Sequence, residues 1–326
     1  MKYRTLGKTG FAISEISLGT WQLGGKWGES FDEATAMRTL EAAYDNGVNF
    51  FDTADIYQNG MSERAIGKFV KSKDKRIYVT TKCGRKLNPH NAEGYNARNI
   101  RNFVEGSLRN MDMECLDLVL LHCPPTEVYN KDEVFDELEK LKANGLIANY
   151  GVSVEKIEEA KMAMDYDISA IEIIFNMFRL RPATELFPFA QERNVGIIVR
   201  VPLASGLLSG KYTLNSVFGK NDHRAYNRNG EFFDKGETFS GVDYAKGIHA
   251  AERLMSELPT QNLAQSALRY ILMHPAVSTV IPGASSPEQI TANIGASALP
   301  PFTPEAMNKV QQIYDEEIRQ LVHHLW

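Results

Sequence analysis

Residues 116–152, LDLVLLHCPPTEVYNKDEVFDELEKLKANGLIANYGV, decide the fold class. The stretch opens on an apolar run, 116–122, that does not alternate with polar residues. A segment with helical periodicity follows at 131–143, and a second short run follows at 148–152. Parallel strands covered on both faces have this composition, and a helix returns the chain over the sheet between them. The stretch therefore predicts a strand–helix–strand unit of an α/β protein.

The same unit recurs along almost the whole chain. Helices are predicted at 32–46, 62–70, 97–111, 131–143, 154–164, 184–193 and 287–296. Eight strands are predicted, at 16–18, 48–52, 78–82, 116–122, 148–152, 170–174, 196–201 and 279–281. Because eight parallel strands close into a (β/α)8 barrel, we predict a TIM barrel and a single domain over residues 1–326. The rival architecture, an open doubly wound sheet, lacks its GxGxxG fingerprint after the first strand.

Three segments add to the regular barrel. The opening, YRTLGKTGFAISEISLG, has a glycine-rich centre between alternating segments and predicts a β-hairpin before the barrel. Residues 203–278 are too long for one loop between the seventh and eighth strands. We predict a mobile stretch at 219–241 and extra helices over 244–274. A further helical addition is predicted at the C-terminus.

Composition and charge exclude several classes of protein. A formal net charge of -5, with lysine and arginine scattered, gives no footprint for nucleic acid. No apolar run approaches the ~18 residues of a membrane span, and MKYRTLGKTG lacks the apolar stretch of a signal peptide. Cys83, Cys115 and Cys123 show no CxxC spacing and suit a reducing compartment. We therefore expect a cytoplasmic protein without a membrane partner; no feature marks its oligomeric state.

Polar residues at the strand ends are the candidates for function, because a (β/α)8 barrel builds its active site there. They converge on one rim and are Asp52, Lys82, His122, Ser153, Glu172 with Asn176, and Arg200. Tyr57 lies five residues beyond Asp52, close enough to fold its phenol over the same rim. This set predicts an active site at the C-terminal mouth of the barrel.

Asp52, Lys82, Tyr57 and His122 together indicate acid–base chemistry. A tyrosine has an ordinary pKa of about 10, and a nearby ammonium group stabilises its ionised form. A carboxylate offsets the cost of burying that ammonium, and an imidazole can hydrogen-bond a substrate carbonyl. Taken singly, each residue is more often structural, but their occurrence at successive strand ends favours catalysis. The other histidines lack metal-ligand spacing, so no metal is predicted.

These residues and their surroundings resemble the aldo-keto reductase family, in particular its bacterial NAD(P)H-dependent members. The matching segments are YRTLGKTGFAISEISLGTW, NFFDTADIYQNGMSERAIGK, SLRNMDMECLDLVLLHCP, KANGLIANYGVS, PLASGLLSGKY and VIPGASSPEQITAN, in this order. The resemblance implies a catalytic tetrad of Asp52, Tyr57, Lys82 and His122. In it Tyr57 is the acid in reduction and the base in oxidation.

The resemblance also implies a nicotinamide cofactor lying extended across the barrel mouth, without a Rossmann fold. On this pattern Ser153 binds the carboxamide, 203–207 wraps the pyrophosphate and 283–285 holds the adenosine end. The expected cofactor contacts are Gly19, Thr20, Trp21, Asp52, Ser153, Glu172, Arg200, Pro202, Leu203, Ser205, Gly206, Leu207, Ser209, Lys211, Gly283, Ser285, Gln289 and Asn293.

Three positions at the nicotinamide end depart from the family pattern. Val154 stands where many members have asparagine, and Glu172 stands where they have glutamine. Arg200 replaces an aromatic residue that often stacks on the nicotinamide. Because a guanidinium plane can stack as well, we expect Arg200 to lie against the ring and to pair with Glu172.

At the adenosine end, Ser285, Ser286 and Gln289 replace the basic residues that usually bind the 2′-phosphate of NADPH. NADP(H) is expected over NAD(H) as the family default, with a modest preference.

The expected function is transfer of a hydride between NAD(P)H and an aldehyde, ketone or sugar, with Tyr57 as general acid and base. Trp21 and Trp27, together with Tyr57 and His122, are the candidate walls of the substrate pocket, and buried packing is the competing interpretation for both tryptophans. Two alternatives stay open. One is an NAD-linked sugar dehydrogenase, and the other is a cofactor-sensing regulatory subunit resembling potassium-channel β subunits.

Overall fold

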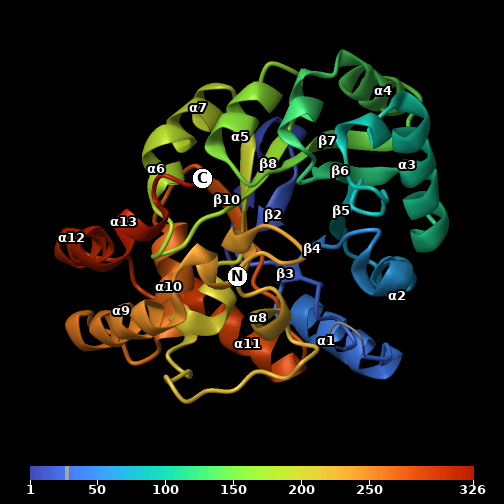
Figure 1. Cartoon of the computed structure of the whole chain (residues 1–326). Helices are drawn as coiled ribbons and strands as arrows, with labels where there is room; N and C mark the ends of the chain where they lie inside the picture. Colours follow the sequence, from blue (N-terminus) through green and yellow to red (C-terminus); the bar gives the residue numbers. More distant parts are fainter. Residues whose placement is uncertain (26–28) are drawn as a thin grey trace.

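The computed structural model describes residues 1–25 and 29–326 (Figure 1). In this part of the chain, one eight-stranded parallel sheet has the order β3-β4-β5-β6-β7-β8-β9-β10. Its strands are β3 Leu18–Gly19, β4 Phe50–Asp52, β5 Tyr78–Cys83, β6 Leu116–His122, β7 Ile147–Ser153, β8 Ala170–Ile174, β9 Gly196–Arg200 and β10 Val277–Val280. Parallel bridges of Ile16 with Val280 and of Gly19 with Gly283 join the two edges. The sheet thus closes into the predicted barrel.

Helices cover the outside of the barrel (Figure 1). They are α1 Glu33–Asp45, α2 Met61–Lys71, α3 Ala97–Met111, α4 Asp132–Ala143, α5 Ile157–Ala163, α6 Arg181–Glu185, α7 Phe187–Glu192, α8 His223–Tyr226, α9 Tyr244–Glu257, α10 Leu263–Leu272, α11 Pro287–Ile294, α12 Pro304–Ile313 and α13 Arg319–Val322. Short helical turns relevant to the site are η2 Tyr57–Gly60, η5 Ala204–Ser209, η6 Lys235–Glu237 and η7 Phe239–Gly241. Side-chain caps begin several helices, as Asp32 does by accepting from Thr35 N in front of α1. None of the helices in the described residues has the length and apolarity of a membrane span.

The N-terminal hairpin closes one end of the barrel. Strands β1 Tyr3–Thr5 and β2 Ala12–Ser14 pair antiparallel, as predicted. Leu6 and Ile13 pack with inward-facing residues of the barrel strands, among them Leu118, Leu120 and Ile198. The apolar interior therefore ends in the hairpin, and the polar side chains gather at the opposite, C-terminal ends of the strands.

Two predicted segments differ from the structure. The helix predicted at 184–193 is broken at Leu186 into α6 and α7, with Pro188 in the first turn of α7. Proline lacks the amide hydrogen and clashes with the carbonyl four residues earlier, so one continuous helix cannot form there. The segment 219–241, predicted to be mobile, folds into α8, η6 and η7, and the buried Asn227 accepts from Phe232 N and Phe233 N.

Candidate active site

The side chains that end the strands meet at the C-terminal mouth of the barrel. Asp52 ends β4, His122 ends β6 and Ser153 ends β7, while Lys82 lies one residue before the end of β5. The parallel register pairs His122 with Ser153, and Ser153 with Glu172 on β8. Residues that are paired in this way stand at one level of the sheet, which brings distant parts of the sequence together.

Lys82 is the centre of a buried charge cluster. Its Nζ donates to both carboxylate oxygens of Asp52, at 2.6 and 2.7 Å, and to the carbonyl oxygen of Thr53 at 3.1 Å. Oε2 of Glu172 lies 3.4 Å from the same Nζ. Burial alone would lower the pKa of Lys82, but the carboxylates of Asp52 and Glu172 outweigh it and raise that pKa. Lys82 is therefore a cation at any pH near neutrality.

Tyr57 reaches this cluster from η2, which follows β4. The Nζ of Lys82 lies 5.3 Å from the centre of the Tyr57 ring, and the ring meets that of His122 edge-on at 6.0 Å. Burial raises the pKa of Tyr57, and Lys82 opposes this effect without overcoming it. The phenol is therefore protonated at neutral pH. Lys82 lowers the pKa of Tyr57, as the sequence predicts, but burial raises that pKa by more.

His122 is a neutral imidazole beside this tyrosine. Burial lowers its pKa well below the ordinary value, and the cations Arg85, Lys82 and Arg200 lower it further. Its Nδ1 is buried and has no hydrogen-bond partner among the described residues. A neutral ring can donate one hydrogen bond to a substrate oxygen, which is the role that the sequence predicts for it.

Arg200, at the end of β9, contacts more groups than the sequence indicates. Its Nη2 lies 2.9 Å from Glu155 Oε2 and donates to the carbonyl oxygen of Val154 at 3.1 Å. The expected partner, Glu172, is farther away, with 3.9 Å between Arg200 Nε and Glu172 Oε1. Ser153 Oγ donates to that same Oε1 at 3.3 Å. Glu155 is therefore the main partner of Arg200, and Glu172 is a secondary one.

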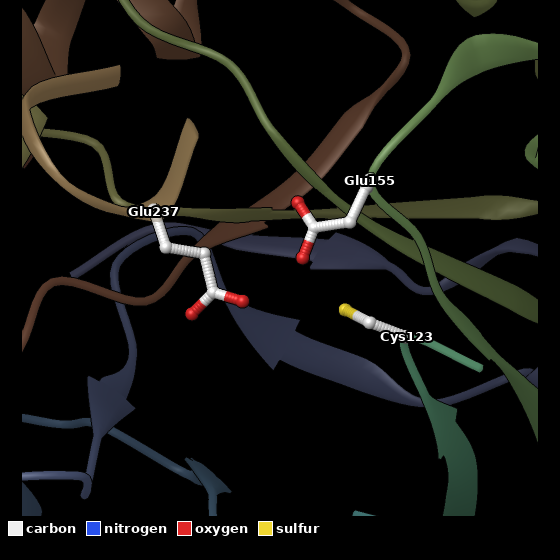
Figure 2. A group of neighbouring side chains, drawn as sticks. All are labelled: Cys123, Glu155 and Glu237. Carbon is white, nitrogen blue, oxygen red and sulfur yellow. The ribbon is translucent and has the colours of Figure 1, made fainter. Parts of the chain in front are cut away.

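Arg200 belongs to a network that the sequence analysis missed. Figure 2 shows Cys123, Glu155 and Glu237 pointing toward one another, and one ligand atom of each lies within 4.8 Å of the others. Such a trio offers ligands for a cation, but two guanidinium groups already neutralise its carboxylates. Besides the Arg200 contact, Nη2 of Arg85 pairs with Glu237 and lies 3.4 Å from Glu155. We assign this cluster as an ion-pair network that joins the barrel rim to η6.

The two carboxyl groups of this network differ in their protonation. Burial raises the pKa of Glu155 to about 7. Burial alone would also raise the pKa of Glu237, but Arg85 and Arg200 lower it to about 2. Glu155 stands two residues after the end of β7, so the rule of polar strand ends could have found it. Glu237 and Arg85 are 152 residues apart, and no pattern in the sequence connects them.

The segments expected to bind the pyrophosphate and the adenosine are already held by internal hydrogen bonds. Ser205 Oγ, in η5, donates to the carbonyl oxygen of Glu237 at 3.0 Å and accepts from Phe239 N. Ser285 N and Oγ both donate to Gln289 Oε1, at 2.8 and 3.1 Å. Ser286 caps α11. The other residues expected at the pyrophosphate lie in η5 or directly beside it: Pro202, Leu203, Gly206, Leu207, Ser209 and Lys211. Gly283 pairs with Gly19, and Asn293 is buried in α11.

The remaining expected contacts lie around β3. Thr20 is fully buried, and its Oγ1 donates to the carbonyl oxygen of Asp52 at 2.7 Å, so it holds the end of β4. The ring of Trp21 meets that of His223 at 4.6 Å and that of Phe233 at 6.5 Å. Trp21 therefore contacts the long segment between β9 and β10. Trp27 lies outside the described residues.

Fold and site together define an α/β barrel with a buried charge cluster at its mouth. The profile of the aldo/keto reductase family matches residues 15–315, and the chain belongs to this family, whose members generally use NAD(P)H. Solved structures agree with this assignment. The aldo-keto reductase AKR11C1 from Bacillus halodurans, in its holo form, is 30% identical, with 96% of each chain covered and a TM-score of 0.78.

Two other relatives carry more specific names. The glycerol dehydrogenase AKR11B4 from Gluconobacter oxydans is 26% identical, with a TM-score of 0.79 and coverage of 97% of this chain and 96% of the other. A probable voltage-gated potassium channel subunit beta from Oryza sativa subsp. japonica is 29% identical, with 96% of each chain covered. Relatives of closely similar length thus carry the name of an enzyme in one case and of a probable channel subunit in the other.

Proposed function

We propose that this protein is a carbonyl reductase that transfers a hydride between NAD(P)H and a small aldehyde, ketone or sugar. The observation that carries the proposal is the position of Lys82. Held by two hydrogen bonds from its Nζ to Asp52, this buried cation lies beside the Tyr57 ring, and Tyr57 in turn lies beside His122. A proton donor, a fixed cation and a neutral hydrogen-bond donor thus lie close together at the barrel mouth, and reduction of a carbonyl requires such a set.

Each residue has one role in this proposal. Tyr57 gives its phenolic proton to the carbonyl oxygen in reduction and accepts it in oxidation. Lys82 stabilises the phenolate that this transfer leaves, and Asp52 holds Lys82 in place. His122 donates a hydrogen bond to the carbonyl oxygen and orients it toward Tyr57. Trp21 and Trp27 are the proposed walls of the substrate pocket.

The mouth fits a polar cofactor. Buried atoms without a hydrogen-bond partner among the described residues include His122 Nδ1, Glu172 Oε2 and Arg200 Nε. Buried polar groups rarely stay unpaired, so they indicate a polar ligand at this place. The bound nicotinamide cofactor supplies the hydride; Ser153 and Glu172 would hold its carboxamide, and the Arg200 guanidinium would lie against its ring.

The other cofactor contacts follow the family pattern. The residues around η5 would bind the pyrophosphate, and Ser285, Gln289 and Asn293 the adenosine end. We propose NADP(H) over NAD(H), with a modest preference because serine and glutamine stand at the 2′-phosphate position. The protein would work as a single-domain enzyme on small molecules in the cytoplasm, as its free cysteines and charge pattern favour.

Two observations favour alternative functions. The likeness to a glycerol dehydrogenase supports a polyol or sugar dehydrogenase that runs with NAD in the oxidative direction. The likeness to a channel β subunit supports a cofactor-sensing regulatory protein. The complete Asp52–Tyr57–Lys82–His122 set favours an enzyme over a sensor.

The deciding experiment measures initial rates of NADPH and NADH oxidation with a panel of aldehydes, ketones and sugars. NADP⁺ and NAD⁺ reduction is measured with the corresponding alcohols and polyols. We expect turnover in the reductive direction that disappears in Tyr57→Phe. Cofactor binding without turnover on any substrate would support the regulatory alternative, and absence of cofactor binding would contradict all three functions.

A further inference from the structure

We propose that Glu172 determines which redox form of the cofactor the site prefers: its carboxylate favours the oxidised, positively charged nicotinamide and thereby favours carbonyl reduction. This inference rests on the proposed function, because it requires a nicotinamide ring at the barrel mouth. It assigns to Glu172 a role as a charge beside the reacting ring, in addition to that of a hydrogen-bond partner.

The reaction itself places the ring near Glu172. Hydride transfer requires the reacting carbons to approach to about 3–3.5 Å. The carbonyl must also lie within reach of Tyr57 and His122, which give it a proton and a hydrogen bond. Tyr57 lies over Lys82, with 5.3 Å between the ring centre and Nζ, and that Nζ is 3.4 Å from Glu172 Oε2. A nicotinamide ring that transfers a hydride to this carbonyl therefore lies close to Glu172.

Glu172 has a carboxylate oxygen, Oε2, that can accept a hydrogen bond from a ligand at this place. Its side chain is 2% exposed, and Oε2 has no hydrogen-bond partner among the described residues. Oε1 is used, since Ser153 Oγ donates to it at 3.3 Å. A buried carboxylate oxygen without a donor is unfavourable. Either an amide N–H or a positive charge on a ligand would remove this cost.

The charge of Glu172 is only partly neutralised by its neighbours. Lys82 is shared with Asp52, to which it is closer, at 2.6 Å. Arg200 Nε is 3.9 Å away, and the Nη2 of Arg200 is engaged by Glu155. Each neighbouring cation is therefore committed first to another carboxylate. Net negative charge is left at Glu172 for a third cation.

The oxidised nicotinamide is that third cation, since the ring is neutral when reduced. An opposite charge within about 4–6 Å changes a charge equilibrium by roughly one to three powers of ten. Because Lys82 and Arg200 offset part of the effect, we expect about tenfold. Reduction moves a hydride to the carbonyl carbon and a proton from Tyr57 to the carbonyl oxygen, which leaves one positive charge on the ring. Glu172 stabilises that product state.

Glu172 also acts on Tyr57, but in the opposite direction. Burial raises the pKa of Tyr57 most, and the charges of Asp52 and Glu172 raise it further. The phenol thus keeps its proton until a carbonyl is bound. A higher pKa makes Tyr57 a weaker acid, so this effect opposes proton transfer to the carbonyl oxygen. The preference for reduction therefore comes from the stabilised oxidised ring, which the ratio of the cofactor dissociation constants measures separately.

The test uses Glu172→Gln, which removes the charge and keeps the shape. The dissociation constants of NADP⁺ and NADPH are measured by calorimetric or fluorescence titration of the full-length wild type and variant. We expect the ratio of the NADP⁺ constant to the NADPH constant to increase about tenfold in Glu172→Gln. Structural damage would weaken both forms together, so it would leave this ratio unchanged. Glu172→Asp keeps the charge and should stay within about threefold of the wild type.

Two controls separate Glu172 from the rest of the network. Glu155→Gln removes the carboxylate that lies nearest to Arg200, whose other two carboxylate neighbours are Glu172 and Glu237, and should change the ratio by less than threefold. Arg200→Met removes a cation that the proposed function places against the ring, and it should lower the ratio, which shows that the ratio responds to charge at this place. If Glu172→Gln does not fold, Glu172→Ala is measured in its place, with the same expected increase of the ratio.

A ratio within twofold of the wild type in Glu172→Gln overturns the inference. So does an equal change of the ratio in Glu155→Gln. The proposed function fails separately, if the wild type binds neither form of the cofactor or if Tyr57→Phe keeps wild-type turnover.

Discussion

The ammonium nitrogen of Lys82 lies 3.4 Å from Oε2 of Glu172, although β6 and β7 separate their strands in the barrel wall. The contact crosses the mouth of the barrel. Since Lys82 also holds Asp52, one buried cation serves two carboxylates. Tyr57 therefore lies beside a larger buried charge network, in which a change at one residue alters the charge balance of the others.

Removal of Lys82 tests this network directly. We expect Lys82→Met to lower the free energy of unfolding by about 3–5 kcal/mol, because it leaves Asp52 as a buried charge without its cation and leaves Glu172 with the more distant Arg200 alone. Burial already raises the pKa of Asp52, and the loss of Lys82 raises it further, so the folded variant takes up a proton first as the pH falls. The loss should therefore be smaller at pH 5 than at pH 8 in urea denaturation.

The double variant Asp52→Asn/Lys82→Met is the matched control, since it removes one charge of each sign. It should be more stable than Lys82→Met alone at pH 8. In the pH–rate profile, Lys82→Met should also raise the apparent pKa of the acid. An unchanged profile with substantial activity would mean that Lys82 does not tune Tyr57.

Tyr57→Phe removes the proton donor and keeps the ring. We expect turnover to fall about 10²–10⁴-fold, the usual contribution of a general acid, while cofactor binding stays nearly intact. Steady-state rates and a cofactor titration measure the two effects. Tyr3→Phe, which removes the hydroxyl of an exposed tyrosine that donates to Gly47 O, should have wild-type rates. If Tyr57→Phe kept more than half of wild-type turnover, with chemistry limiting the rate, Tyr57 would not be the acid.

Asp55 predicts how stability depends on pH. It is 3% exposed, neither of its carboxylate oxygens has a hydrogen-bond partner among the described residues, and burial raises its pKa from 3.8 to about 7. Between these two pH values the folded state holds a proton that the unfolded state releases. This group therefore lowers stability as the pH rises through the window, and the full cost is present above about pH 7.

Asp55→Asn removes that cost. We expect the variant to be more stable than the wild type by about 2–4 kcal/mol at pH 8, with a smaller gain at pH 5. Denaturant unfolding at both pH values measures the difference. Asp74→Asn, at an exposed position, should change stability little at either pH. An equal gain at the two pH values would show that the charge of Asp55 is not the cause.

The cofactor preference depends on position 289. Gln289 carries no positive charge for a 2′-phosphate, and its Oε1 accepts hydrogen bonds from Ser285 N and Oγ. We expect the wild type to bind both cofactors, with NADPH favoured by less than about a thousandfold, or ~4 kcal/mol. Gln289→Arg should tighten NADPH binding by about tenfold or more, because a charge-assisted hydrogen bond to phosphate contributes ~1.5–3 kcal/mol. NADH binding is the internal control and should not change. A wild-type preference above a thousandfold would mean that another cation contacts the phosphate.

Much of the fold could be predicted because its signals are local. The runs at 116–122 and 196–201 are apolar without alternation, and helical periodicity separates them from their neighbours, which is sufficient to indicate a barrel. Asp52, Lys82 and His122 stand at the ends of such runs, so their meeting at one rim follows from the parallel arrangement. The apolar runs, the helical periodicity and the residues at the strand ends depend on neighbours along the chain, so they can be recognised without knowledge of distant contacts.

Charge balance at the site depended on the tertiary structure alone. The pairing of Arg85 with Glu237 joins residues 152 apart, and the approach of Glu172 to Lys82 depends on the closed barrel. Burial raises the pKa of Tyr57 against the effect of Lys82, and this loss of solvent is a property of the folded state. The sequence therefore determined which acid–base residues share the barrel mouth. Only three-dimensional distance and burial decided which carboxylate each cation serves, because Coulomb interactions and desolvation act through space and not along the chain.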